Sequence, residues 1–164
     1  MRSLLPFLAA FALAGCGLHP LYAGGPAGTP AVGFRSVEVG PIPQRTGWLT
    51  RNALVDRFGG EHPGSVYRLE VELDDSITGF GIRGDSATTR ERRALRARYR
   101  LIERASGAVV LDATAGSDAG IDVVSSEYAT VAAEQTAAER LSDQVADQIV
   151  TRVARYFTAA SNRP

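Results

Sequence analysis

The segment from Arg90 to Glu103 alternates apolar and basic side chains, and this pattern constrains the fold more than any other feature of the chain. A period of two is that of a β-strand with one face buried and the other in water. The apolar face carries Leu95, Ala97, Tyr99 and Leu101. The opposite face carries a row of arginines, namely Arg90, Arg92, Arg96, Arg98, Arg100 and Arg104. The chain is therefore expected to build a sheet with one apolar face.

The other periodic segments complete a domain with two layers. The expected elements are, in chain order, a strand at 34–39, a helix at 45–58, strands at 65–73, 90–103 and 108–115, and a helix at 127–157. Residues 75–89 are expected to form a long hairpin loop, because they are rich in Gly, Asp, Ser and Thr, and 116–126 a second loop. The order β-α-β-β-β-α predicts an α+β fold, a two-layer sandwich in which a four-stranded, mostly antiparallel sheet carries two helices on one face.

The first sixteen residues predict that the chain is exported and anchored to a membrane by lipid. A positively charged start precedes an apolar run over 4–13, which is too short to span a bilayer. The run ends in Leu-Ala-Gly-Cys, which resembles the lipobox of bacterial lipoproteins and implies cleavage after Gly15 and acylation of Cys16. Gly17 stands where an Asp would imply retention at the inner membrane, so the resemblance implies the periplasmic side of the outer membrane. The alternatives are a plain secretory signal with an incidental cysteine, or a buried structural cysteine.

The chain therefore divides into a leader, a tether and one domain. The expected parts are a signal peptide at 1–15, the lipidated Cys16 with a flexible tether at 16–33, a single α+β domain at 34–158, and a frayed tail at 159–164. A hydrophobic share of 45% with 22% charged residues is that of a folded domain. The formal net charge is zero, so the composition gives no sign of nucleic acid as a partner.

The residues around the lipobox and the order of the elements together resemble one family. Residues 15–22 read Gly-Cys-Gly-Leu-His-Pro-Leu-Tyr. This is similar to the start of the LptE-type lipopolysaccharide-assembly lipoproteins of alphaproteobacteria, Gly-Cys-Gly-Phe-Arg-Pro-Leu-Tyr, with departures at Leu18 and His19. The resemblance implies an outer-membrane lipoprotein that plugs the large β-barrel exporting lipopolysaccharide, helps it assemble, and contacts lipopolysaccharide. The alternative is a general envelope lipoprotein that binds another outer-membrane or cell-wall component.

The arginine row is the candidate site for anionic groups of lipopolysaccharide or for the barrel. Guanidinium groups on alternate residues of a strand lie about 7 Å apart and can bind phosphate or carboxylate through two hydrogen bonds. The alternative is pairing with Glu70, Glu72 and Asp74 on the neighbouring strand, although three acids do not neutralise six arginines. Two apolar residues at the tip of the expected loop either contact the barrel wall or lipid, or fold back on the core. The candidate contact residues are Arg90, Arg92, Arg96, Arg98, Arg100, Phe80 and Ile82.

No arrangement of residues predicts catalysis, a metal site or a cofactor. The two histidines, His19 and His62, fall in the tether and in a loop, and Cys16 is the only cysteine, so no metal-ligand spacing is present. Residues 79–84 resemble a phosphate-binding loop only superficially, because they lack Lys-Ser/Thr and do not open a helix. We therefore expect a protein that is not an enzyme and holds no cofactor.

Overall fold

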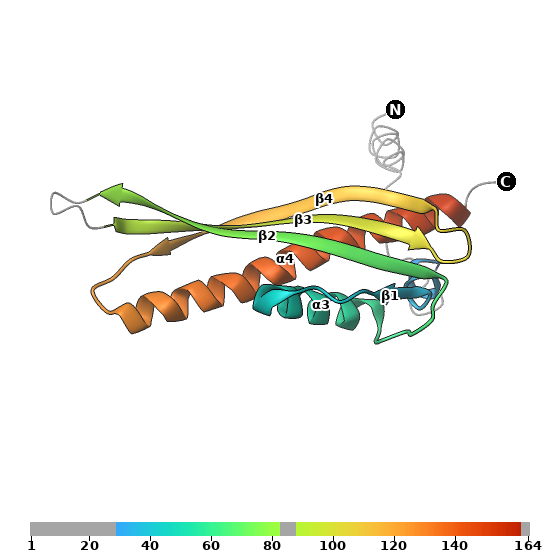
Figure 1. Ribbon diagram of the computed structural model, residues 1–164, viewed down its shortest axis with the longest axis horizontal. Helices are drawn as coiled ribbons and strands as arrows, with labels where there is room; N and C mark the ends of the chain where they lie inside the picture. The colour runs from blue at the N-terminus through green and yellow to red at the C-terminus, as the bar shows by residue number, and fades with distance from the viewer. Residues whose placement is uncertain (1–28, 83–87, 162–164) are drawn as a thin grey trace, which may run out of the picture.

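The computed structural model describes residues 29–82 and 88–161 of the 164-residue chain (Figure 1). Its elements are, in chain order, the short helix α2 (Thr29–Phe34), strand β1 (Val37–Val39), helix α3 (Gln44–Phe58), strands β2 (Tyr67–Ile82), β3 (Thr88–Glu103) and β4 (Val109–Asp122), and the long helix α4 (Glu127–Ser161). The strands form one sheet in the order β1-β2-β3-β4, with β1 parallel to β2 and the other pairs antiparallel. The predicted α+β two-layer sandwich is confirmed, and α2 is a further short helix that precedes it.

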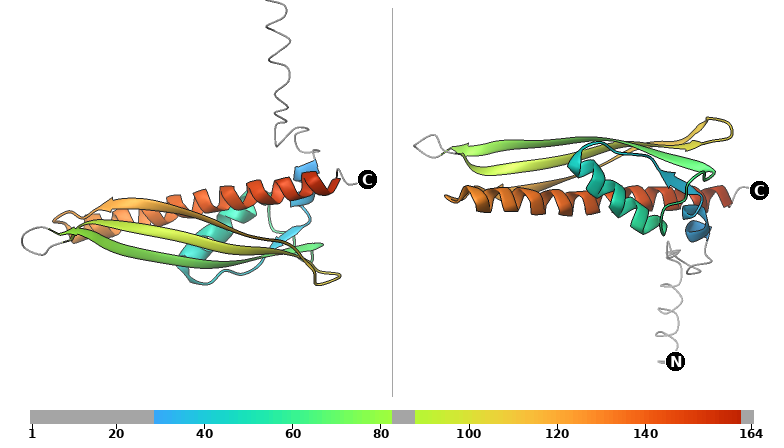
Figure 2. Two further views of the ribbon diagram at one scale, coloured as in Figure 1. Left: turned by 90° about the horizontal axis from the view of Figure 1, so that it is seen from above. Right: turned by 60° about the horizontal axis from the view of Figure 1, so that its bottom comes forward.

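Both long helices lie on the same face of the sheet, and the other face is open to solvent (Figure 2). α4 runs along the sheet, whereas α3 packs on α4 and β1 and covers only the part of the sheet near β1. We call the end of the molecule with α2 and β1 the proximal end. The end at which β2 stops and β3 begins is the distal end.

The core lies between the sheet and α4, as the alternation in β3 predicts. The inward residues of β2 and β3 meet an apolar stripe of α4 that recurs every four residues, which keeps it on one side of the helix. These buried residues are Leu69, Val71, Leu95, Ala97, Tyr99, Leu101, Leu141, Val145, Ile149 and Val153. Burial of the odd-numbered residues of β3 fixes its even-numbered residues on the solvent face.

The strands of the hairpin are much longer than predicted. The loop expected at 75–89 is wrong, because β2 continues to Ile82 and β3 begins at Thr88. The loop expected at 116–126 is wrong in the same way, since β4 continues to Asp122. Pairing with β3 runs in unbroken register from Tyr67 opposite Glu103 to Phe80 opposite Arg90, and this ladder overrides the weak strand preference of the glycines. Phe80 therefore lies on a strand rather than at a loop tip.

The boundary between tether and domain also differs from the prediction. Residues 29–33, expected in the flexible tether, form most of α2 and pack on the end of α4. A side chain at Gly33 would put its Cβ 2.5 Å from the ring of Phe157, so the absence of one allows this close approach. Phe34 is buried with its ring centroid 5.2 Å from that of Phe58. The domain therefore begins a few residues earlier than its apolar pattern indicates.

Candidate functional site

The candidate site is the solvent face of the sheet, which the even-numbered residues of β2, β3 and β4 make up. Five of the predicted contact residues lie on this face of β3, namely Arg90, Arg92, Arg96, Arg98 and Arg100. Carboxylates from both neighbouring strands flank them. Cys16 lies outside the described residues, as does the side chain of Ile82.

Three of these arginines pair with acids of β4 rather than β2. Arg98 holds Asp112 through two contacts, Nη2 to Oδ2 at 3.0 Å and Nε to Oδ1 at 3.3 Å. This hydrogen bonding lowers the pKa of Asp112 and raises the pKa of Arg98. Arg96 binds both oxygens of Asp118, at 2.9 and 3.0 Å. Arg90 binds Asp122 at 3.0 Å.

The acids of β2 stand opposite the arginines in the register, yet among the described arginines of β3 Arg100 alone pairs with them, and Arg68 of β2 itself lies 3.7 Å from Glu70. Glu72 faces Arg98 and Asp74 faces Arg96 across the ladder. Arg100 approaches Glu70 and Glu72 at 3.4 Å each. Asp74 has no basic partner in the part of the chain that the structure describes.

The charges on this face balance, which corrects the expected excess of arginine. The described basic residues of the face are Arg68, Arg90, Arg92, Arg96, Arg98, Arg100 and Arg104. The described acids are Glu38, Glu70, Glu72, Asp74, Asp112, Asp118 and Asp122. The acids of β4 and β1 were missing from the sequence argument, and they bring the two sets to equal size. The face is therefore a mixed polar surface and not a cationic strip.

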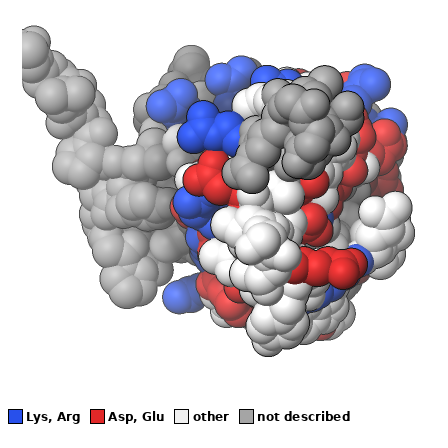
Figure 3. Space-filling view, turned by 90° about the vertical axis from the view of Figure 1, so that its left-hand side faces the viewer, with Lys and Arg blue, Asp and Glu red and all other residues white. Residues whose placement is uncertain are grey.

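Among the described arginines of this face, one has no acidic partner, and it lies at the distal end. Arg92 is exposed and stands between Thr78 and Gly120 without an acidic partner among the described residues. Phe80, which is 47% exposed, lies nearby opposite Arg90 and borders a hollow of about 250 Å³. We call Phe80, Arg90 and Arg92 the distal patch. In Figure 3, which looks onto this end, basic side chains gather along the upper border and uncharged ones in the lower middle.

On the helix side of the sheet, a partly buried ion pair joins the distal strands to both long helices. Arg93 Nη2 lies 2.6 Å from Asp75 Oδ2, and the two side chains are 14% and 12% exposed. Thr46 at the start of α3 donates to the same Asp75 oxygen at 2.6 Å, and Arg93 Nη1 donates to the carbonyl of Glu134 in α4 at 2.9 Å. Sequence reasoning missed this pair, although the odd numbers of both residues placed them on the inner face.

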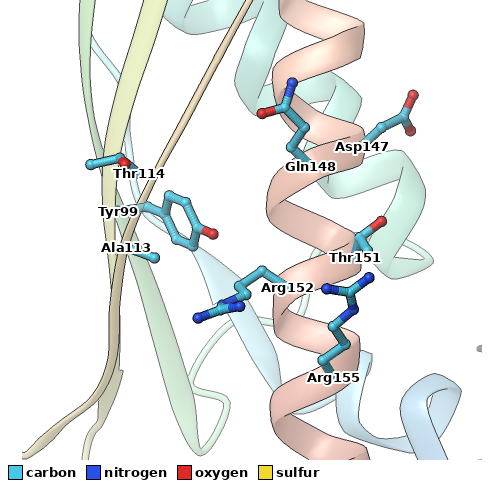
Figure 4. Close-up of a pocket in the computed structure, with 8 residues that line it drawn as sticks. All are labelled: Tyr99, Ala113, Thr114, Asp147, Gln148, Thr151, Arg152 and Arg155. Atoms are coloured by element: carbon cyan, nitrogen blue, oxygen red, sulfur yellow. The ribbon is translucent and has the colours of Figure 1, made fainter.

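A groove between β4 and α4 holds further unpaired cations (Figure 4). It has a volume of about 590 Å³, and Tyr99 lies against it with its hydroxyl toward α4. Burial raises the pKa of Tyr99, and the charge of Arg152 opposes that rise. Arg152 and Arg155 have no acidic partner within the described residues. The sequence contained a signal for this, because neither arginine has an acid three or four positions away along the helix.

Within the described ranges, no helix is both long and apolar enough to cross a bilayer. The same residues contain no group of three or more His, Cys, Asp or Glu placed to hold a metal ion.

Comparison with known proteins gives a family and a set of related folds. The model of the LptE family, described as lipopolysaccharide-assembly, matches residues 34–153. No curated protein matches the chain.

The solved structures with this fold include several lipoproteins. One from Caulobacter crescentus is 23% identical, with a TM-score of 0.66 over 82% of this chain and 98% of its own. The rare lipoprotein B of Shewanella oneidensis is 8% identical, with a TM-score of 0.58 over 77% of this chain and 98% of its own. Lipoprotein B of Nitrosomonas europaea is 13% identical, with a TM-score of 0.57 over 75% and 84% of the two chains. At these identities the likeness concerns the fold.

Proposed function

This chain belongs to the LptE family of lipopolysaccharide-assembly lipoproteins, and we propose on that premise that it plugs and helps to assemble the lipopolysaccharide export barrel. The observation that carries the proposal is the family match over residues 34–153, which include the whole sheet, α3 and most of α4. The family is one of non-catalytic lipoproteins, so the proposed role is structural and rests on binding.

We further propose that the protein is held to the periplasmic side of the outer membrane through Cys16. The lipobox and Gly17 support this location in the cell envelope. Residues 17–28 separate Cys16 from α2, and a segment of that length spans at most about 40 Å. The domain can therefore reach a barrel in the same membrane while its lipid stays in the inner leaflet.

For contact with lipopolysaccharide we propose the distal patch first. A phosphate there would meet the free guanidinium of Arg92, which can donate two parallel hydrogen bonds, and an acyl chain would meet the exposed ring of Phe80. Arg96, Arg98 and Arg100 reach an anion only by giving up a carboxylate that they already hold. They therefore have a secondary part in this contact.

The role at the barrel is tested by purification of the tagged mature chain from membranes in detergent. We expect a stable one-to-one complex with a very large β-barrel protein. Depletion of the chain should lower both the amount of assembled barrel and the surface lipopolysaccharide. Recovery of the chain alone, with surface lipopolysaccharide unchanged by depletion, would favour the alternative of a general envelope lipoprotein with another partner.

The lipopolysaccharide contact is tested with two matched variants, Arg92→Gln and Arg98→Gln. Both remove one guanidinium from the same face of β3, but only Arg98 is already neutralised, by Asp112. Binding of purified lipopolysaccharide should weaken in Arg92→Gln and lose part of its salt dependence, because screening acts on exposed charges. Arg98→Gln should bind almost as the unchanged protein does. Equal effects in the two variants would remove the distal patch from the site.

A further inference from the structure

The outer edge of β2 is covered over only a small part of its length. β1 pairs with β2 from Tyr67 to Leu69, and the amide of Gly40 makes the next bond, to the Leu69 carbonyl, at 2.9 Å. Pro41 and Pro43 follow, and neither has an amide hydrogen with which to extend a ladder. Beyond them β2 is the border of the sheet, and α3 approaches its distal half at the first helical turn, where Thr46 donates to the Asp75 side chain (Figures 1 and 2).

The backbone geometry shows which groups point outward along this border. The Tyr67 amide donates to the Ser36 carbonyl, and the Leu69 carbonyl accepts from Gly40, so both point away from β3. Because the register with β3 is unbroken from Tyr67 to Phe80, the following odd-numbered residues keep that orientation. The outward N–H and C=O groups are those of Leu73, Asp75, Ile77 and Gly79. None of them has a backbone partner among the residues that the structure describes.

The side chains protect this edge at one end alone. Residues 76–79 read Ser-Ile-Thr-Gly and carry neither a charge nor a proline, whereas Asp74 and Asp75 precede them. Ile77 is 43% exposed and Phe80 47%. Natural edge strands are usually blunted by lysine, proline, a bulge or a covering element, and a long unprotected edge is a template for another strand. A row of alternating donors and acceptors is satisfied best by a second extended backbone.

We propose that residues 73–79 of β2 accept an extended segment of the barrel protein as an added strand of this sheet; this inference rests on the proposed function. The edge adjoins the distal patch, so one segment can contact both.

A second copy of this chain fits the edge less well than a single strand does. In an antiparallel pair of two copies over residues 73–79, residue 82 of one copy falls opposite Glu70 of the other. Gly40 and the residues after it already lie there, beside Leu69. A single extended segment that ends before Gly40 meets no such obstacle.

The first test uses proline on each edge of the sheet. Ile77→Pro removes an outward amide hydrogen without breaking a bond to β3, so the fold tolerates it. Thr114→Pro is its matched control on β4. Both backbone groups of Gly116 bond to the side chain of Gln148, away from β3, and Thr114 has the same orientation. We expect Ile77→Pro to lower the recovery of barrel with the tagged chain at least fivefold, and Thr114→Pro to leave it unchanged.

A photo-crosslinking residue in place of Ser76 provides a second measurement, which does not depend on whether the proline variants fold. In cells it should yield an adduct between the chain and the barrel, and the same residue at Thr114 should not. The edge inference is overturned if both proline variants recover equal amounts of barrel. It is also overturned if the residue at Ser76 gives an adduct between two copies of the chain, or gives no adduct. None of these outcomes contradicts the proposed function. An unchanged chain that recovers no barrel at all refutes the proposed function itself.

Discussion

The ion pair between Arg93 and Asp75 should be the polar contact that contributes most to fixing the distal strands on the helices. Its two guanidinium bonds to the carboxylate measure 2.9 and 2.6 Å, and further bonds lead to Thr46 and to the Glu134 carbonyl. Arg93→Met leaves a carboxylate that is only 12% exposed without its counter-charge. Breaking one side of a buried pair costs about 3–5 kcal/mol, and the remaining exposure places the expected loss near the lower end, about 3 kcal/mol.

The double variant distinguishes a true pair from two independent contacts. Replacing Arg93 by Met and Asp75 by Leu removes both charges together, so no uncompensated charge stays buried. The loss should then fall to about 1 kcal/mol, chiefly for the bonds to Thr46 and Glu134. The free energy of unfolding of Arg93→Met, Asp75→Leu and the double variant is measured in urea melts followed by circular dichroism. Urea is used because guanidinium, being a salt, would screen the pair. A double variant that loses as much as the two single variants added together would refute the reasoning.

Three further changes test other parts of the protein. Cys16→Ser removes the thiol that we propose accepts lipid, so the chain should leave the outer-membrane fraction; normal processing and fractionation would contradict the anchor. Gly47→Ala should cost about 2 kcal/mol in a urea melt, because its Cβ would lie 2.7 Å from the Ile42 carbonyl oxygen. Asp75→Asn should flatten the acid limb of a stability curve. The hydrogen bond from Arg93 lowers the pKa of Asp75, so the stabilisation is present above its ordinary value of 3.8 and is lost as the pH falls through the lower folded value.

The parts of the fold that the sequence predicts are those with a strict period. β3 alternates strictly from Leu95 to Leu101, and both of these residues are buried on its inner face as expected. The extensions of β2 and β4 are invisible to the same argument, because Gly79, Gly116 and Gly120 have low strand preference and favour a loop locally. Their strand conformation comes from pairing with β3, which is a property of the folded sheet.

The same missing extension explains the error about charge on the candidate site. With 116–126 expected to be a loop, Asp118 and Asp122 had no place beside the arginines. Asp112 was within the predicted strand, on the face opposite Leu111, and parity alone would have placed it there. The close packing of Arg96 on Gly116 follows from the folded sheet and is not predictable from the sequence. A Cβ on Gly116 would lie 2.6 Å from Arg96 Cδ. Residue type and period find the arginines, but the register decides which of them remain free.

Arg92, Phe80 and the open stretch of β2 lie toward the distal end of the molecule, whereas the unpaired Arg152 and Arg155 lie on α4 nearer the proximal end. The chain enters the domain through α2, where Gly33 packs on Phe157 near the end of α4. α4 has 35 residues and is therefore about 50 Å long, and its other end lies near the distal strands. Phe80 lies thirteen residues along β2 from Tyr67 and therefore stands about 40 Å from the proximal end, and the open stretch of β2 begins about 20 Å from it. With the anchor and the barrel partner that we propose, a domain of this shape can keep its lipid in the membrane and still present its unsatisfied donors, acceptors and apolar side chains inside the barrel.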